Sequence, residues 1–127
     1  MDFFDFREYI LSLHAVEECT PFDETTLVYK IAGRMFACAT MEKPDHIVIH
    51  HKPDDGDTLR EQHSEITPAW HFNKRHWSDV RVDGDLPEKF VKHLIFNSYI
   101  YTIHHNVTPK ARREELLKVI KTKYATR

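Results

Sequence analysis

The 127-residue sequence has few of the residues that define several large classes of protein. Its two cysteines, Cys19 and Cys38, form no CxxC pattern and are too few for a disulfide scaffold, which favours a reducing compartment. Three glycines leave no GxGxxG, P-loop or GxSxG motif. No apolar run approaches the roughly 20 residues that span a bilayer, and the acidic start does not resemble a signal peptide. These absences favour a cytoplasmic protein that is neither secreted nor inserted into a membrane.

The chain does contain enough apolar material for a core. Hydrophobic residues make up 41% of the sequence and charged residues 30%, a composition too apolar for intrinsic disorder. A chain of this length fits one domain of ordinary size. We therefore expect a single α/β domain that covers residues 1–127.

The net charge of -2 is the average of two unlike parts. Residues 109–127 hold seven basic and two acidic residues, a net of +5, whereas residues 1–108 hold 11 basic and 18 acidic residues, a net of -7. A dedicated DNA-binding domain usually has a basic body, so this balance argues against tight, nonspecific binding to nucleic acid. The tail has apolar residues at helical spacing, which predicts a basic C-terminal helix docked on the domain. The alternative is an electrostatic arm for DNA or a partner.

The first half of the chain alternates between two kinds of periodicity. Apolar residues at steps of three and four predict an amphipathic helix over residues 2–18. Pro53 and the acids after it predict a short helix that carries Leu59 on its inner side. Between these helices, branched and aromatic residues gather in three short runs, which predict a meander of strands at 27–31, 35–40 and 46–51.

The second half is expected to hold one strand and two helices. The residues from Arg75 to Val82 alternate, which predicts a strand with Arg75, Trp77, Asp79 and Arg81 on one face and His76, Ser78, Val80 and Val82 on the other. A long helix should begin at Pro87. The pair Thr108 and Pro109 is expected to supply the N-cap and first residue of a last helix.

Two stretches, TPAWHFNKRHW at 67–77 and DGDLP at 83–87, stand out beside LVYKI at 27–31 and GRMFA at 33–37. In these residues the chain resembles the MmcQ/YjbR family of small bacterial proteins, over residues 4–106 and without the basic tail. The resemblance implies an α/β (α+β) fold, an antiparallel sheet with helices in a CyaY-like, double-wing arrangement. It also implies the family's usual label, DNA-binding, which rests largely on fold analogy.

The segment from residue 71 to residue 81 is the candidate binding surface. Its cations are suited to phosphate contacts, Asn73 to a base edge, and Trp77 to stacking on a base. The alternative is that Trp70, Phe72 and Trp77 are core aromatics, that the histidines bind backbone groups, and that the cations form a solvated rim. The candidate nucleic-acid or ligand-binding residues are His71, Asn73, Lys74, Arg75, His76, Trp77 and Arg81.

The sequence does not support a metal site, a cofactor or a catalytic residue. Of the ten histidines, His46 and His50 lie about 13 Å apart on an extended strand, and the neighbours His104 and His105 diverge on a helix. Cys38 lies in an apolar run, as an inert buried thiol would. A histidine of the 71–81 segment acting as a general base beside Asp79 is the one remaining catalytic idea.

These observations predict a binding protein that is not an enzyme. The leading hypothesis is weak DNA binding by the 71–81 segment and the basic helix, which requires Arg75, Trp77 and Arg81 exposed on one face. The alternative is a small-molecule binding protein, which requires Trp70, His71 and Trp77 around a concavity. In either case at least one tryptophan should be mostly buried.

Overall fold

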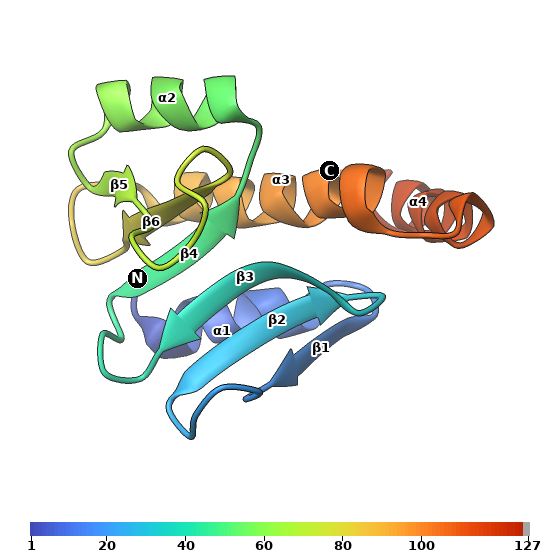
Figure 1. Cartoon of the computed structure of the whole chain (residues 1–127), viewed down its shortest axis with the longest axis horizontal. Helices are drawn as coiled ribbons and strands as arrows, with labels where there is room; N and C mark the ends of the chain where they lie inside the picture. The colour runs from blue at the N-terminus through green and yellow to red at the C-terminus, as the bar shows by residue number, and fades with distance from the viewer. Residues whose placement is uncertain (126–127) are drawn as a thin grey trace.

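A computed structural model describes residues 1–125 of the chain, which form one sheet and four helices (Figure 1). Among these residues the sheet has six strands in the order β1-β2-β3-β4-β6-β5, and every neighbouring pair is antiparallel. The predicted antiparallel α+β fold is therefore confirmed. The elements are α1 (Phe3–Ser12), β1 (Val16–Cys19), β2 (Thr26–Ile31), β3 (Arg34–Thr40), β4 (His46–His50), α2 (Pro53–Gln62), β5 (Ile66–Pro68), β6 (Trp77–Arg81), α3 (Glu88–Asn106) and α4 (Lys110–Lys123).

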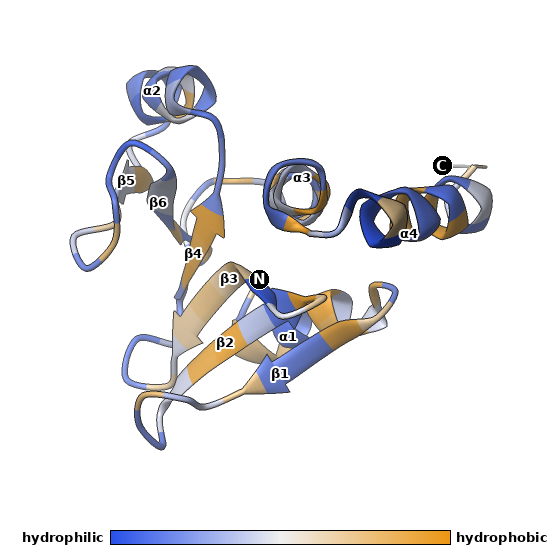
Figure 2. Ribbon diagram, turned by 45° about the vertical axis from the view of Figure 1, so that its right-hand side comes forward, coloured by the Kyte–Doolittle hydropathy of each residue, from blue (hydrophilic) through white to orange (hydrophobic). Residues whose placement is uncertain are grey.

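The helix α3 is the centre of the core. Figure 2 looks nearly along its axis and shows it in the angle between the β1–β3 half of the sheet and the β4–β6 half. Its buried residues recur at helical spacing and supply the interior with Val91, Leu94, Ile95, Ser98, Tyr99, Thr102 and Ile103. This packing places the last two turns of α3 beside the end of β4.

The N-terminal prediction of a helix over residues 2–18 is wrong at its C-terminal end. The helix α1 ends at Ser12, and Ala15 has a φ of 60°, which is incompatible with a continued right-handed helix. Val16 then pairs with Ile31 in the edge strand β1. The apolar spacing extended through Val16 because that side chain packs against the same core from a strand.

Two more boundaries differ from the prediction. The short strand β5 was not predicted, and its proline is tolerated because β5 lies at the sheet edge. The N-cap of α4 is Pro109 rather than Thr108. The strand β6 begins at Trp77, so Arg75 and His76 lie in the preceding loop, whereas the alternation from Trp77 to Arg81 is confirmed.

The basic helix α4 docks on the domain, as the spacing predicted. Leu116 and Ile120 are buried in the common core, and Leu117 and Tyr124 pack against it. Its exposed face carries Lys110, Arg112, Lys118, Lys121 and Lys123. Within residues 1–125 no helix is both long and apolar enough to cross a bilayer.

Candidate functional site

The loop from residue 69 to residue 76 is folded into consecutive tight turns. The backbone N–H of Phe72 donates to the carbonyl of Ala69, and the N–H of His76 donates to the carbonyl of Asn73. The side-chain oxygen of Asn73 accepts a hydrogen bond from the N–H of Arg75 at 3.0 Å. These bonds hold Asn73 and His76 beside the first residue of β6.

A cavity of about 480 Å³ lies between this loop, the start of β3 and the C-terminal part of α3. We call it the basic cleft, because the residues around it include an arginine and histidines but no aspartate or glutamate. They are Arg34, Met35, His50, Asn73, His76, Trp77, Tyr101, His105 and Asn106. The cleft is therefore rich in hydrogen-bond donors and has no side chain that would repel an anion.

The wall of the cleft is built around His50, which is only 9% exposed. Its ring stacks on Trp77 at 4.5 Å and meets Tyr101 edge to face at 4.9 Å. Its Nδ1 lies 2.8 Å from the hydroxyl of Thr102, and its backbone N–H donates to Ser98. The hydroxyl of Ser98 in turn donates to the carbonyl of Phe36, so α3 ties β3 to β4 at this point.

Arg34 brings a permanent positive charge to the cleft. Burial, together with the neighbouring imidazoles of His76, His51 and His105, lowers the pKa of His50 to about 4, so His50 is neutral at pH 7. The side chain of Arg34 forms no ion pair or hydrogen bond with any residue of the part that the structure describes. The exposed guanidinium of Arg34 therefore lies at the cleft without a partner among residues 1–125, and its five N–H groups can donate to a bound anion.

A second histidine, His51, forms a buried network that is structural in character. Its Nδ1–H donates to the carbonyl of Lys52 at 2.7 Å, which leaves Nε2 as an acceptor for the hydroxyl of Ser78 at 2.7 Å. Arg60 also donates to this hydroxyl at 2.7 Å. Ser78 is fully buried, so no substrate can reach its oxygen as a nucleophile, although the serine–histidine distance matches that of an activated pair.

The residues described form no metal cluster, and the thiol of Cys38 is poorly suited to react. No group of three or more histidine, cysteine or acidic side chains among residues 1–125 is arranged to hold a metal ion. His46 binds Asp79 at 2.8 Å, at the opposite end of β4 from His50. Burial raises the pKa of the Cys38 thiol to about 11, so the thiolate that could attack a substrate is scarce.

The structure brings together only part of the predicted binding surface. Asn73, His76 and Trp77 line the basic cleft, whereas His71 lines a different cavity with Phe72 and Asp79. Three predicted residues line neither of these cavities: Lys74, which lies over the ring of Trp70 at 3.9 Å; Arg75, which is exposed; and Arg81, which faces Asp83 at 3.7 Å.

Sequence reasoning missed six residues of the cleft, namely Arg34, Met35, His50, Tyr101, His105 and Asn106. Arg34 follows Gly33 within the GRMFA stretch. This stretch supported the family resemblance but did not indicate a role for Arg34. Sequence reasoning treats His50 and His105 only as possible metal ligands. These residues belong to three separate elements, so only the fold joins them.

The two tryptophans have different environments. Trp70 is 71% exposed, so its prediction as a core aromatic is wrong. Trp77 is mostly buried between His50 and Phe72, which confirms that at least one tryptophan is buried. Because both neighbours are rings, Trp77 is a packed wall of the cleft and has little free surface for stacking on a base.

Most of the chain matches a known protein family. The profile of the YjbR family matches residues 11–100, and the chain therefore belongs to this family. The match ends before the basic helix α4.

Relatives in this family include proteins and solved structures without a described activity. The uncharacterized protein YjbR of Escherichia coli strain K12 is 28% identical over 88% of this chain and 94% of its own length. The uncharacterized protein YbdF of Escherichia coli O157:H7 is 33% identical over 73% of this chain and 77% of its own length. The crystal structure of Deinococcus radiodurans protein DR2400, with a DUF419 domain, covers 88% of this chain and 85% of its own, with 34% identity and a TM-score of 0.81.

A Pseudomonas syringae protein of known structure has the same fold. It covers 77% of this chain and 96% of its own, with a TM-score of 0.66 and 23% identity. At this identity the likeness extends to the fold alone.

Proposed function

We propose that this protein is a non-enzymatic binding protein that holds a small anionic molecule in the basic cleft. The observation that carries the proposal is the unpaired guanidinium of Arg34 at a cavity of about 480 Å³ with no carboxylate in its wall. Ligand sites are typically concave, of about 300–1,000 Å³, with a few polar groups that fix orientation. An anion would supply the partner that Arg34 lacks.

The polar groups of the cleft support the same ligand chemistry. Within residues 1–125, the side chains of His76, His105 and Asn106 line it without a hydrogen-bond partner, and the side-chain amide nitrogen of Asn73 donates to none. Each of these groups can donate to an oxygen of a phosphate or carboxylate. The neutral His50 and the ring of Tyr101 supply an aromatic wall beside them.

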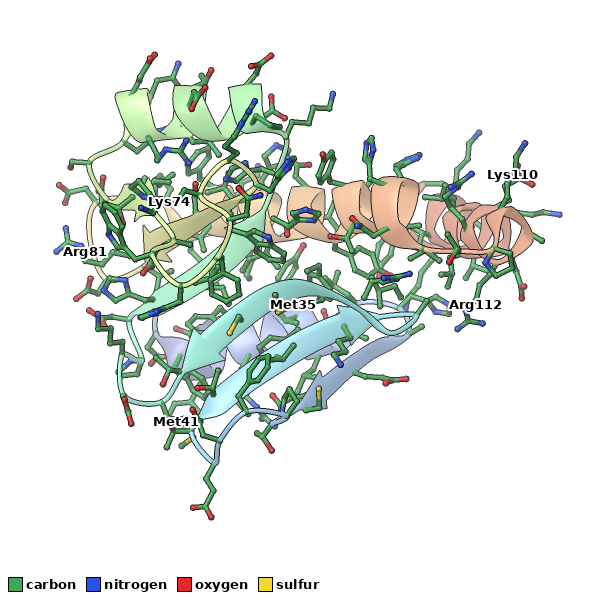
Figure 3. The ribbon with its side chains drawn as sticks, in the orientation of Figure 1. Met35, Met41, Lys74, Arg81, Lys110 and Arg112 are labelled. Carbon is green, nitrogen blue, oxygen red and sulfur yellow. The ribbon has the colours of Figure 1, made fainter. Side chains whose placement is uncertain are left out.

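The DNA-binding hypothesis stays a prediction, and the arrangement of the cations supports it less well. Figure 3 shows Lys74 and Arg81 near one end of the molecule and Lys110 and Arg112 near the other, with Met35 of the cleft between them. The 71–81 segment and the basic helix therefore do not form one continuous positive surface. Each alone offers a duplex few cations beside an acidic body.

The experiment is a titration with inorganic phosphate, followed by the fluorescence of Trp77 in a Trp70→Phe background. We expect saturable binding that is weakened about tenfold or more by Arg34→Gln, because one charge-assisted pair is lost. Arg75→Gln is the matched control, since this exposed cation does not line the cleft. Equal loss in both variants, or no binding at all, would disprove the proposal.

A duplex-DNA titration at low and moderate salt tests the rival hypothesis. If the 71–81 segment binds DNA, replacing Arg75 and Arg81 with alanine should lower the salt slope by about two. Such a result, together with unchanged phosphate binding in Arg34→Gln, would favour DNA as the ligand.

A further inference from the structure

A second cavity, of about 350 Å³, shares a wall with the basic cleft. It lies between α2 and α3, and both His50 and Tyr101 line it as well as the basic cleft. The two hollows are therefore neighbours on either side of one pair of aromatic rings.

The lining of the second cavity differs in character from that of the basic cleft. Leu59 and Phe90 are only partly buried, and together with the core residue Leu94 they give the cavity an apolar side. Lys52 and Asp55 bring charges of both signs, so no net charge selects an anion there. The side formed by Leu59, Phe90 and Leu94 suits an uncharged, apolar group, whereas the rest of the lining is largely polar.

The helix α2 does not cover the apolar side of the second cavity. Figure 2 shows α2 as a mostly hydrophilic helix, and Gly56 is its only buried residue. An alanine at this position would place its Cβ 2.1 Å from the ring of His51, so α2 is fixed against the histidine by the absence of a side chain. Because Gly56 and Arg60 anchor the helix at His51 and Ser78, Leu59 is held beside the cavity without filling it.

We infer that the ligand is an organic anion with an apolar ring-sized group, its charged end in the basic cleft and its apolar end between α2 and α3. This inference rests on the proposed function and adds the class of molecule. The basic cleft has the anion site, and the second cavity has the apolar side formed by Leu59, Phe90 and Leu94. Together the two cavities provide an anion site and an apolar side, which adjoin at the pair His50 and Tyr101.

The test compares methyl, phenyl and 2-naphthyl phosphate, which carry the same anionic group, by calorimetry on the full chain. We expect affinity to rise about tenfold or more from methyl to the better of the two ring esters, because burying part of an aromatic ring removes apolar surface from water. Asn97→Phe, at an exposed residue that lines the second cavity, should abolish this gain and leave methyl phosphate binding unchanged. His104→Phe, at an exposed position of α3 outside both cavities, is the matched control and should retain the gain.

The outcomes separate this inference from the proposed function. If all three esters bind equally and Arg34→Gln weakens them all, the anion site stands and the bipartite ligand is wrong. A ring advantage that survives Asn97→Phe also overturns the inference, because the ring then lies elsewhere. If no ester binds, the proposed function fails and the inference fails with it.

Discussion

His50 and Trp77 face each other as paired residues of β4 and β6, and their rings stack at 4.5 Å with 20° between the planes. Tyr101 of α3 closes the edge of the histidine ring at 4.9 Å. Residues from three elements thus form a single aromatic wall that separates two cavities. The stability of this wall is open to direct measurement.

The two tryptophans should differ sharply in their contribution to stability. Trp77→Ala removes a mostly buried ring and should lower the free energy of unfolding by about 3 kcal/mol. Trp70→Ala removes a ring that is 71% exposed and contacts Lys74, and should cost about 1 kcal/mol or less. Urea denaturation of both variants checks this. Similar losses would show that Trp77 is not part of the packed wall.

The stability should fall when the solution is acidified. His50 has a pKa of about 4 in the folded protein against an ordinary 6.5, so the unfolded chain binds more protons between these values. The contribution of neutral His50 is complete above about pH 6.5 and is lost progressively toward pH 4. Between pH 7.5 and pH 5 the expected loss is about 2 kcal/mol.

Denaturation of His50→Gln at the two pH values isolates this contribution. The variant should be less stable at pH 7.5 and should lose correspondingly less on acidification. His104→Gln, an exposed histidine of the same helix, serves as the control and should behave as the unmodified chain does. A pH dependence that His50→Gln leaves intact would assign it to other groups.

Replacing Gly56 by alanine should destabilise the protein, although the same change in an exposed helix is usually favourable. The added Cβ would lie 2.1 Å from Cε1 of His51, so either the ring or the helix must move. We expect a loss of about 1–3 kcal/mol, as for other overpacked sites. Gln62→Ala, at an exposed residue of α2, is the control. A thermal melt in which Gly56→Ala is as stable as the parent would contradict the close contact.

Removing the small side chain of Ser98 should lower the free energy of unfolding by more than its size suggests. Its hydroxyl accepts from the N–H of His50 and donates to the carbonyl of Phe36, both at buried positions. Ser98→Ala leaves these two backbone groups without that partner and should cost about 1–3 kcal/mol. Ser64→Ala, at an exposed serine, should be nearly neutral. Hydrogen exchange at the amide of His50 gives a local readout, and unchanged protection there would argue against the bond.

Much of the fold could be predicted from the sequence because local periodicity reports which side of an element is buried. Short runs of branched and aromatic residues identified the meander of β2, β3 and β4, and the prolines at positions 53 and 87 marked the helix starts within one residue. The apolar spacing of the tail predicted that α4 docks on the domain, and Leu116 and Ile120 are buried in the core. The signature at residues 69–77 pointed to the family and to part of the cleft.

Tertiary structure decided the remaining features. Val16 belongs to a strand because it pairs with the edge of β2, and the local spacing of apolar residues gives no information about that edge. Arg34 and His105 line the same cleft although 71 positions separate them, because the start of β3 and the end of α3 meet at β4. Arg81 shares a strand with Trp77 but lies at its opposite end, so it is excluded from that cleft. Side-chain periodicity is a local property, whereas a binding site is a convergence of distant segments, and that convergence depends on how the sheet bends around α3.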